Sequence, residues 1–159
     1  MLVKGAATRR YDGGRPSDAC RVTLIDTGPL VALIDDLDGF HRPAVRALAS
    51  VPGRATTSWA VIGEAFHLLG RRRGWHAQAP LARLVAARRM EVAELTTLLG
   101  DRSLELMEEY SDSGMDFADA TLVALAETRR DFRIVTFDSD FRFYRLPGGM
   151  SFTVLDGSS

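Results

Sequence analysis

The sequence has little cysteine, almost no net charge and no long apolar run. Its single cysteine among 159 residues, Cys20, excludes an internal disulfide. With 20 basic and 21 acidic residues, the chain has no general attraction for nucleic acid or for a membrane surface. Its apolar runs are shorter than the roughly 18 residues that cross a bilayer, and its start does not resemble a signal peptide. These absences favour a cytoplasmic protein with no membrane partner.

The composition is that of one globular domain, with 46% hydrophobic and 26% charged residues. Residues 1–20 contain several glycines and arginines and show little apolar periodicity. We predict that residues 1–20 form a flexible leader and that residues 21–159 form the domain.

Short runs rich in β-branched residues alternate with longer helical patterns after residue 21. Strands are predicted at 22–25, 55–57, 91–95, 133–136 and 152–155, and helices at 30–34, 40–50, 58–71, 79–87, 98–110 and 116–129. Residues 27–29 are expected to form a turn. The alternation predicts an α/β three-layer sandwich, in which helices flank a short, mainly parallel sheet. Ligands of such sheets bind beyond the carboxyl ends of the strands.

Four acidic residues in apolar surroundings are the candidate site: Asp26, Glu64, Asp119 and Asp138. Asp26 and Asp138 directly follow predicted strands, and the other two lie in the first turns of helices that can start from the same edge. Buried carboxylates are costly unless a cation compensates them, and an all-oxygen set suits Mg²⁺ or Mn²⁺. Because Mg²⁺ binds substrate phosphates, the chemistry indicated is phosphoryl transfer or phosphodiester hydrolysis.

Three of these positions also have an ordinary structural explanation. Asp26 can cap the helix that follows it. Asp116 can cap a later helix, with Asp119 answering it in a capping box, and we favour Asp116 as the cap and Asp119 as the ligand. Asp138 can form a polar turn with Asp140.

Glu64 is the acid with no such explanation. Between Trp59 and Leu69 the only other ionisable group is His67, and no Lys or Arg lies three or four residues from Glu64. A buried, unpaired glutamate predicts a ligand.

The acids lie in four short segments, at residues 24–30, 57–65, 115–120 and 136–141. In this order the segments resemble those of the PIN domain, and in particular the VapC-type toxins of bacterial toxin–antitoxin pairs. The resemblance implies a Mg²⁺-dependent endoribonuclease with an RNA substrate, a small VapB-like antitoxin and a homodimeric state. The catalytic and metal-binding residues it implies are Asp26, Glu64, Asp119 and Asp138, with Asp116 and Asp140 as secondary metal ligands and Thr27 and Thr136 as supporting hydroxyls.

Two other functions compete with this interpretation. A non-catalytic PIN-like scaffold would bind RNA or protein without cutting it. A haloacid-dehalogenase-type phosphatase would use Asp26 as a nucleophile, but that family has a second aspartate where Gly28 stands here.

Two surface features have open alternatives. Arg71 to Arg73 form the densest positive run, which can contact RNA or simply end a helix in solvent. The apolar helices between Leu81 and Leu99 can supply a dimer face, although a core role explains them equally well.

Overall fold

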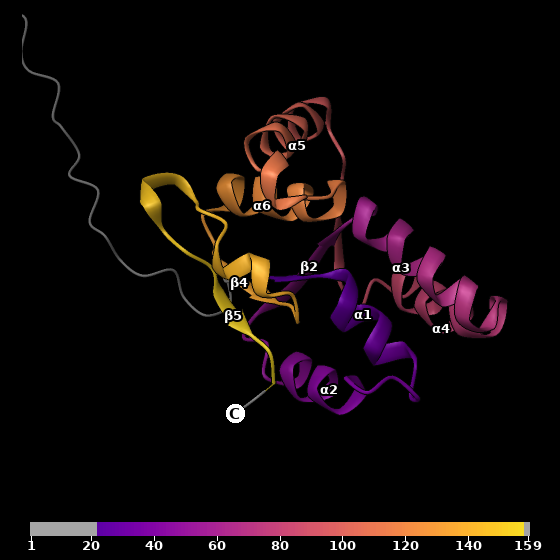
Figure 1. The fold of residues 1–159 in the computed structure, drawn as a ribbon. Coiled ribbons are helices and arrows are strands. Elements are labelled where there is room, and N and C mark those ends of the chain that lie inside the picture. Colours follow the sequence, from indigo (N-terminus) through magenta and orange to yellow (C-terminus); the bar gives the residue numbers. More distant parts are fainter. Residues whose placement is uncertain (1–21, 158–159) are drawn as a thin grey trace, which may run out of the picture.

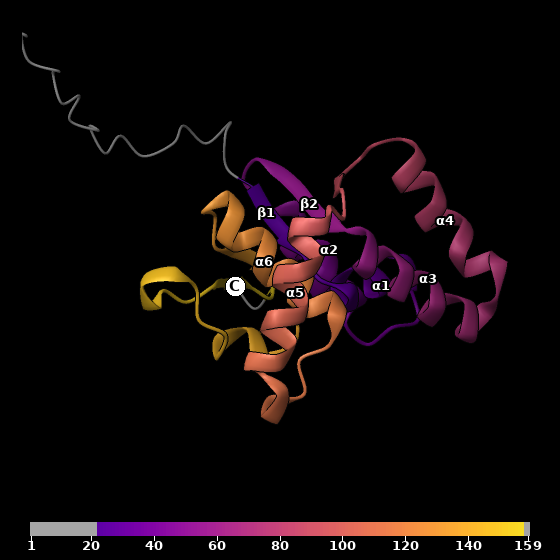
Figure 2. The same cartoon turned by 90° about the horizontal axis from the view of Figure 1, so that it is seen from above.

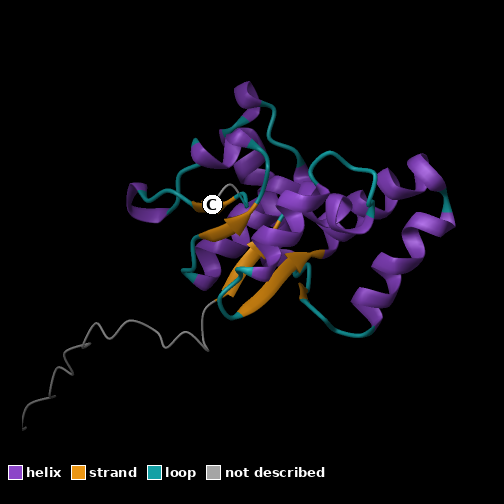
Figure 3. Ribbon diagram, turned by 90° about the horizontal axis from the view of Figure 1, so that it is seen from below, coloured by secondary structure: helices purple, strands orange, loops and turns teal. Residues whose placement is uncertain are grey.

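The computed structural model describes residues 22–157, so the predicted leader at 1–20 lies outside the described residues. The chain forms one sheet of five parallel strands in the order β3-β2-β1-β4-β5 (Figure 3). The strands are β1 (Val22–Ile25), β2 (Arg54–Ser58), β3 (Glu91–Ala93), β4 (Arg133–Val135) and β5 (Thr153–Leu155). Because β1 is central, its carboxyl end lies between those of β2 and β4. The predicted parallel sheet is confirmed.

Helices cover the sheet from more than one side (Figure 1). In that view α5 and α6 lie above the strands, α2 lies below them, and α1, α3 and α4 lie to their right. Figure 2 shows α3 and α4 extending away from the sheet. The helices are α1 (Thr27–Ile34), α2 (His41–Ala49), α3 (Trp59–Arg73), α4 (Trp75–Ala86), α5 (Thr97–Glu109) and α6 (Phe117–Arg129). None of the helices within residues 22–157 is long and apolar enough to cross a membrane.

Helix α6 lies at the centre of the hydrophobic core. Most of its residues from Ala118 to Ala126 are buried, and it packs against both α5 and the strands β1 and β2. The core continues through Leu24 and Ile25 of β1 and Ile134 of β4. A helix that is apolar on nearly all sides must be enclosed, so the start of α6 is held firmly against the sheet.

Helix α1 begins earlier than the predicted start at residue 30. Asp26 caps it, so Thr27, Gly28 and Pro29 form its first turn instead of the expected loop. Pro29 fits there because the first N–H groups of a helix have no partner within the helix.

Helix α4 also begins earlier than predicted, at Trp75 instead of residue 79, and contains Pro80 in its interior. Gly74 separates α3 from α4 with a φ of 59°, which favours glycine. The side-chain amide of Gln78 donates to the carbonyl of Phe66 over 2.8 Å and thereby ties α4 to α3. This tertiary contact supports a helix that proline alone would shorten.

The remaining predicted elements agree with the structure apart from small shifts of their ends. Within the described residues, three short 3₁₀ helices were not predicted, at Ser111–Ser113, Ser139–Arg142 and Pro147–Gly149. The fold thus carries Asp26 and the segment of Asp138 to the carboxyl edge of adjacent strands, β1 and β4.

Candidate active site

Asp26 is the most buried of the candidate acids, with 7% of its surface exposed. It caps α1, because its Oδ1 accepts a hydrogen bond from the amide of Thr27 over 2.6 Å. Its Oδ2 accepts a 2.7 Å hydrogen bond from the hydroxyl of Thr136, the residue after β4. The capping explanation is therefore correct, and the same side chain also joins the ends of two neighbouring strands.

Glu64 lies on α3 and is half-buried, which is less than the burial that the sequence predicted. Its Oε2 accepts a 2.6 Å hydrogen bond from the hydroxyl of Thr27. Within the described residues it forms no salt bridge, as the lack of nearby cations in the sequence predicted. Thr27 thus contacts both acids, through its amide to Asp26 and through its hydroxyl to Glu64.

The two acids at the start of α6 have different settings. Asp116 is exposed and caps the helix, because its Oδ1 accepts a 2.8 Å hydrogen bond from the amide of Asp119. Asp119 is half-buried, and its Oδ2 accepts a 3.3 Å hydrogen bond from the hydroxyl of Tyr144. This division agrees with the preference for Asp116 as the cap and leaves the Asp119 carboxylate facing inward.

Asp138 forms the polar turn that was its alternative explanation. Its Oδ1 accepts from the amide of Asp140 over 2.8 Å, and its own amide donates to the hydroxyl of Thr136 over 2.9 Å. Asp138 is exposed and Asp140 is half-buried. Thr136 therefore connects this turn to Asp26, since the same hydroxyl donates to the Asp26 carboxylate.

The carboxylates are close enough to oppose one another's ionisation. Burial raises the pKa of Asp26 to about 6, and the charges of Asp138 and Glu64 add to this against the hydrogen bonds from Thr136 and Thr27. Burial likewise raises the pKa of Asp119 to about 8, with further contributions from Asp116, Asp26 and Asp138. Each of the four predicted acids thus belongs to one electrostatic cluster.

Such a cluster has the chemistry of a hard-cation site, because it combines several carboxylates that form no salt bridge with any basic side chain in residues 22–157. Within residues 22–157, however, no three acidic or histidine side chains stand close enough to enclose a metal ion. Carboxylate oxygens are suitable ligands for Mg²⁺ or Mn²⁺. The structure brings the four carboxylates near one another but does not arrange them as a complete set of metal ligands.

A cavity of about 420 Å³ opens beside Glu64 of this cluster and beside Asp116, the cap of α6. Its other lining residues are apolar, and they come from the starts of α3 and α6 and the segment after β3: Trp59, Ala60, Leu95, Phe117 and Ala118. Sequence reasoning missed this cavity, although Trp59 stands five residues before Glu64. A larger cavity of about 660 Å³ lies between β3, α5 and α6 and contains none of the predicted acids.

Sequence reasoning also missed Tyr144, which is 1% exposed and contacts Asp119. Its ring packs edge-on against Tyr110 and Phe141. Burial raises the pKa of Tyr144, as do the charges of Asp119 and Asp140, so it stays a neutral hydrogen-bond donor. No local motif marks this residue, because its contact with Asp119 depends on the tertiary fold.

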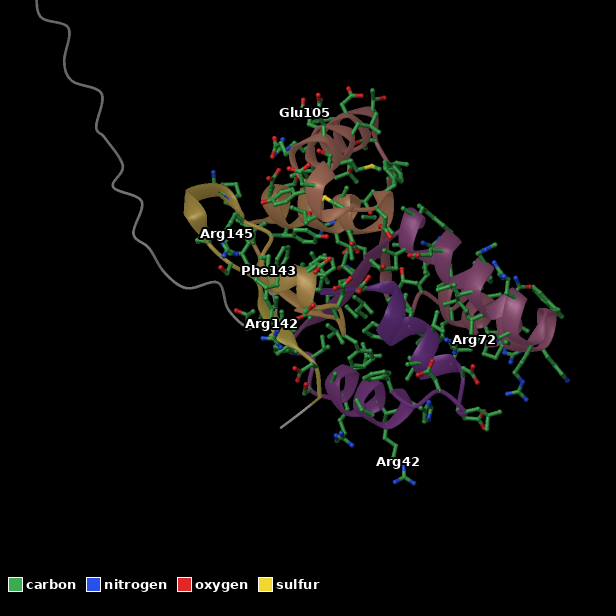
Figure 4. The ribbon with its side chains drawn as sticks, viewed as in Figure 1. Arg42, Arg72, Glu105, Arg142, Phe143 and Arg145 are labelled. Carbon is green, nitrogen blue, oxygen red and sulfur yellow. The ribbon has the colours of Figure 1, made fainter. Side chains whose placement is uncertain are left out.

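The basic run at the end of α3 is largely engaged with acidic partners. Arg72 contacts Asp35 at 3.0 Å and Asp38 at 2.7 Å, and Arg73 approaches Asp35 and Asp36. Arg142 and Arg145 lie on the C-terminal segment with Phe143 between them, away from Arg72 (Figure 4). Arg142 pairs with Asp156, and Arg145 donates to three backbone carbonyls. A structural role therefore accounts for Arg72 and Arg73.

The apolar helices considered for a dimer face are divided between core and surface. Leu81 and Leu99 are buried, whereas 46% of Leu95 and 81% of Leu98 are exposed. The core explanation holds for the first pair, and homodimerisation stays a prediction.

Comparison with known proteins matches residues 23–148 to the PIN domain. The 23S rRNA-specific endonuclease VapC20 of Mycobacterium tuberculosis is 31% identical over 118 residues, which cover 74% of this chain and 90% of that relative. The crystal structure of the same M. tuberculosis protein, described as a Sarcin-Ricin loop cleaving toxin, matches with a TM-score of 0.70 and 29% identity. That match covers 75% of this chain and 91% of VapC20.

Two further solved structures share the fold at lower identity. A toxin–antitoxin complex from Klebsiella pneumoniae has a TM-score of 0.61 at 20% identity, covering 86% of this chain and 98% of that one. VapBC2 from Rickettsia felis, bound to a promoter DNA fragment, has a TM-score of 0.61 at 16% identity, covering 85% and 99%. The α/β architecture is therefore the one found in these toxin structures.

Proposed function

Since the chain belongs to the PIN domain family, we propose that it is a metal-dependent endoribonuclease that acts as the toxin of a toxin–antitoxin pair. The observation that carries the proposal is the cluster of Asp26, Glu64, Asp119 and Asp138 at the carboxyl edge of the sheet, where burial and mutual repulsion raise two pKa values. The family match favours this nuclease over the phosphatase alternative.

The proposed metal is Mg²⁺ or Mn²⁺, held by Asp26, Glu64, Asp119 and Asp138, with Asp116 and Asp140 as secondary ligands. When bound, the metal would supply an activated water and neutralise charge on the leaving oxygen of a phosphodiester. Thr27 would orient Glu64, and Thr136 would orient Asp26, through the hydrogen bonds that their hydroxyls donate. Tyr144 would orient Asp119 in the same way.

The proposed substrate is RNA, and ribosomal RNA is the first class to test because the relative VapC20 is named for 23S rRNA. A small antitoxin and a second copy of the chain are the proposed protein partners. We also propose that residues 1–20 are a leader separate from the nuclease domain at 21–159. Co-purification of the chain with the product of a short neighbouring reading frame would test the antitoxin.

Single charge-removing substitutions in the cluster test the enzymatic proposal. Asp26→Asn and Glu64→Gln are expected to reduce Mg²⁺-dependent cleavage of ribosomal RNA by at least about 100-fold and to relieve growth inhibition. Asp101→Asn is the matched control, because Asp101 is an exposed acid on α5 and is not among the charges that act on Asp26 or Asp119. Circular dichroism would establish that each variant is folded.

If the protein is instead a non-catalytic scaffold, we expect a different result in a calorimetric titration with Mn²⁺. The titration would show no Mn²⁺ binding to the wild type, or equal Mn²⁺ binding to the wild type and to Asp26→Asn. Cleavage that persists in a folded, metal-free Asp26→Asn, Glu64→Gln double variant would also overturn the nuclease proposal.

A further inference from the structure

The cavity beside the acids has an exposed aromatic side chain in its lining. Trp59 is the first residue of α3, and half of its surface, 50%, is exposed. The same cavity is lined by Glu64 and Asp116. A molecule whose charged part lies at the carboxylate cluster therefore has an apolar surface directly next to it.

The backbone that carries Trp59 is firmly held. Ser58 is 2% exposed and caps α3, accepting a hydrogen bond from the amide of Val61 over 3.2 Å. Its hydroxyl also forms a 2.7 Å hydrogen bond with that of Thr121 on α6, which lies beside α3 in Figure 1. Trp59 thus presents its half-exposed ring from a fixed backbone, so little backbone entropy is lost when a ligand contacts it.

The start of α6 repeats the same arrangement of residue types. Ser58 is followed by Trp59 and Ala60, and Asp116 is followed by Phe117 and Ala118, so each cap precedes an aromatic residue and then an alanine. Both aromatic residues and both alanines line the cavity. The alanines add little bulk, and the cavity keeps a volume of about 420 Å³ between larger side chains.

We infer that this cavity is a subsite for one unpaired nucleobase of the RNA, which stacks on Trp59 next to the phosphodiester at the acids. The inference rests on the proposed function. A nucleobase is flat, apolar on its faces and linked through its ribose to the phosphate that a metal at Glu64 would contact, so the nucleotide fits both parts of the lining. Exposed aromatic rings next to a phosphate site are the usual stacking platform for single strands.

The subsite requires an unpaired nucleotide. A base within a duplex already stacks on its neighbours on both faces, and an A-form helix does not offer those faces to a side chain. The enzyme would consequently cut at loops or single-stranded segments and not within a regular duplex. The class of substrate is thus RNA with an exposed base beside the cleaved bond.

Tryptophan fluorescence can measure this contact independently of cleavage. The chain has two tryptophans, and the second, Trp75, is also the first residue of an α-helix, with 67% of its surface exposed. In an Asp26→Asn, Trp75→Phe protein, Trp59 is the only indole. Titration with a single-stranded hexaribonucleotide in Mg²⁺ is expected to quench the fluorescence of Trp59. Titration with a hairpin stem that contains the same sequence is expected to leave this fluorescence unchanged.

Matched substitutions test the role in the reaction. Trp59→Ala is expected to weaken hexanucleotide binding and raise KM by roughly tenfold, with kcat changed less, and Trp59→Phe should recover most of the loss. Trp75→Ala is the control and should bind as the wild type does. An RNA that is abasic at the base next to the cleaved bond should bind wild type and Trp59→Ala equally.

Three results would overturn the subsite. The first is that the Trp59→Ala and Trp75→Ala variants both still cut RNA and have equal KM and equal affinity for the hexanucleotide. This result would leave the proposed function intact. Another is equal quenching by hairpin stem and single strand. The third is conversion of a dimer to a monomer by Trp59→Ala in analytical ultracentrifugation, which would assign the surface to a second copy. Absence of cleavage by the wild type would instead refute the proposed function.

Discussion

The hydroxyl of Thr27 donates a 2.6 Å hydrogen bond to Oε2 of Glu64, across 37 residues of sequence. The amide of Thr27 donates to Asp26 at the same time, so one residue at the start of α1 sets the relative positions of two candidate metal ligands. Its side chain is 5% exposed, and few other arrangements are open to it.

Thr27→Val is expected to reduce RNA cleavage by about tenfold or more while the fold survives. Valine keeps the shape but removes the hydroxyl, which leaves the Glu64 carboxylate without its donor and free to move. Cleavage rates at increasing Mg²⁺ would show a higher metal requirement for Thr27→Val. Thr27→Ser, which keeps the hydroxyl, is the control, and equal metal requirements for the valine and serine variants would contradict the role.

Tyr144→Phe tests the corresponding contact on Asp119. The substitution removes a 3.3 Å hydrogen bond and keeps the ring that packs against Phe141, so the unfolding free energy should fall by only about 1 kcal/mol. We expect reduced metal affinity in a Mn²⁺ titration because Asp119 loses its positioning donor. Unaltered Mn²⁺ affinity together with unaltered cleavage would show that Tyr144 serves packing alone.

The acid cluster predicts that the metal-free protein loses stability as the pH rises. The pKa of Asp26 is raised to about 6 and that of Asp119 to about 8, both from an ordinary 3.8. A raised carboxyl pKa means that folding favours the neutral acid, so this contribution is complete below about pH 4 and is lost as the pH passes through 6 and 8. Thermal unfolding in EDTA should therefore give a lower Tm at pH 8.5 than at pH 5.

Two comparisons separate this effect from general alkaline instability. Asp26→Asn and Asp119→Asn should each reduce the fall in Tm, because each removes a carboxyl that ionises unfavourably, whereas Asp101→Asn should not. Mg²⁺ should raise the wild-type Tm more at pH 8.5 than at pH 5, since ligands must be deprotonated to bind metal. A wild-type Tm in EDTA that does not vary across this range would contradict the prediction.

The sequence predicted those parts of the site that depend on local pattern. Asp26 and Asp138 were found because each follows a buried strand, and parallel strands end at one edge. Capping of α6 by Asp116 also followed from local rules, because a helix cap needs an acceptor three residues before a free amide, and Asp119 as a ligand stays a prediction. Family resemblance then selected the same four acids as a set.

The parts that were missed depend on contacts between distant segments. Thr27 reaches Glu64 across 37 residues, and Tyr144 reaches Asp119 across 25. The early start of α4 accompanies its packing against α3, through the buried Ala77 and Leu81 and the hydrogen bond from Gln78 to the carbonyl of Phe66, in spite of the interior Pro80. Hydrophobic periodicity and helix propensity contain no information on such side-chain contacts. A contact of this kind can shift the first residue of a helix from the position that the local sequence predicts.

Arg72→Met is expected to lower stability without weakening RNA cleavage. The Arg72 guanidinium joins the loop after α1 to the end of α3 through Asp35 and Asp38, and it lowers the pKa of Asp38. Its side chain is 44% exposed, so the loss should be about 1 kcal/mol or less in urea unfolding and should shrink in about 1 M NaCl. Arg71→Met is the control, because Arg71 is exposed and makes no ion pair within the described residues. If Arg72→Met instead raised KM for RNA severalfold at unchanged stability, the basic run would be an RNA contact after all.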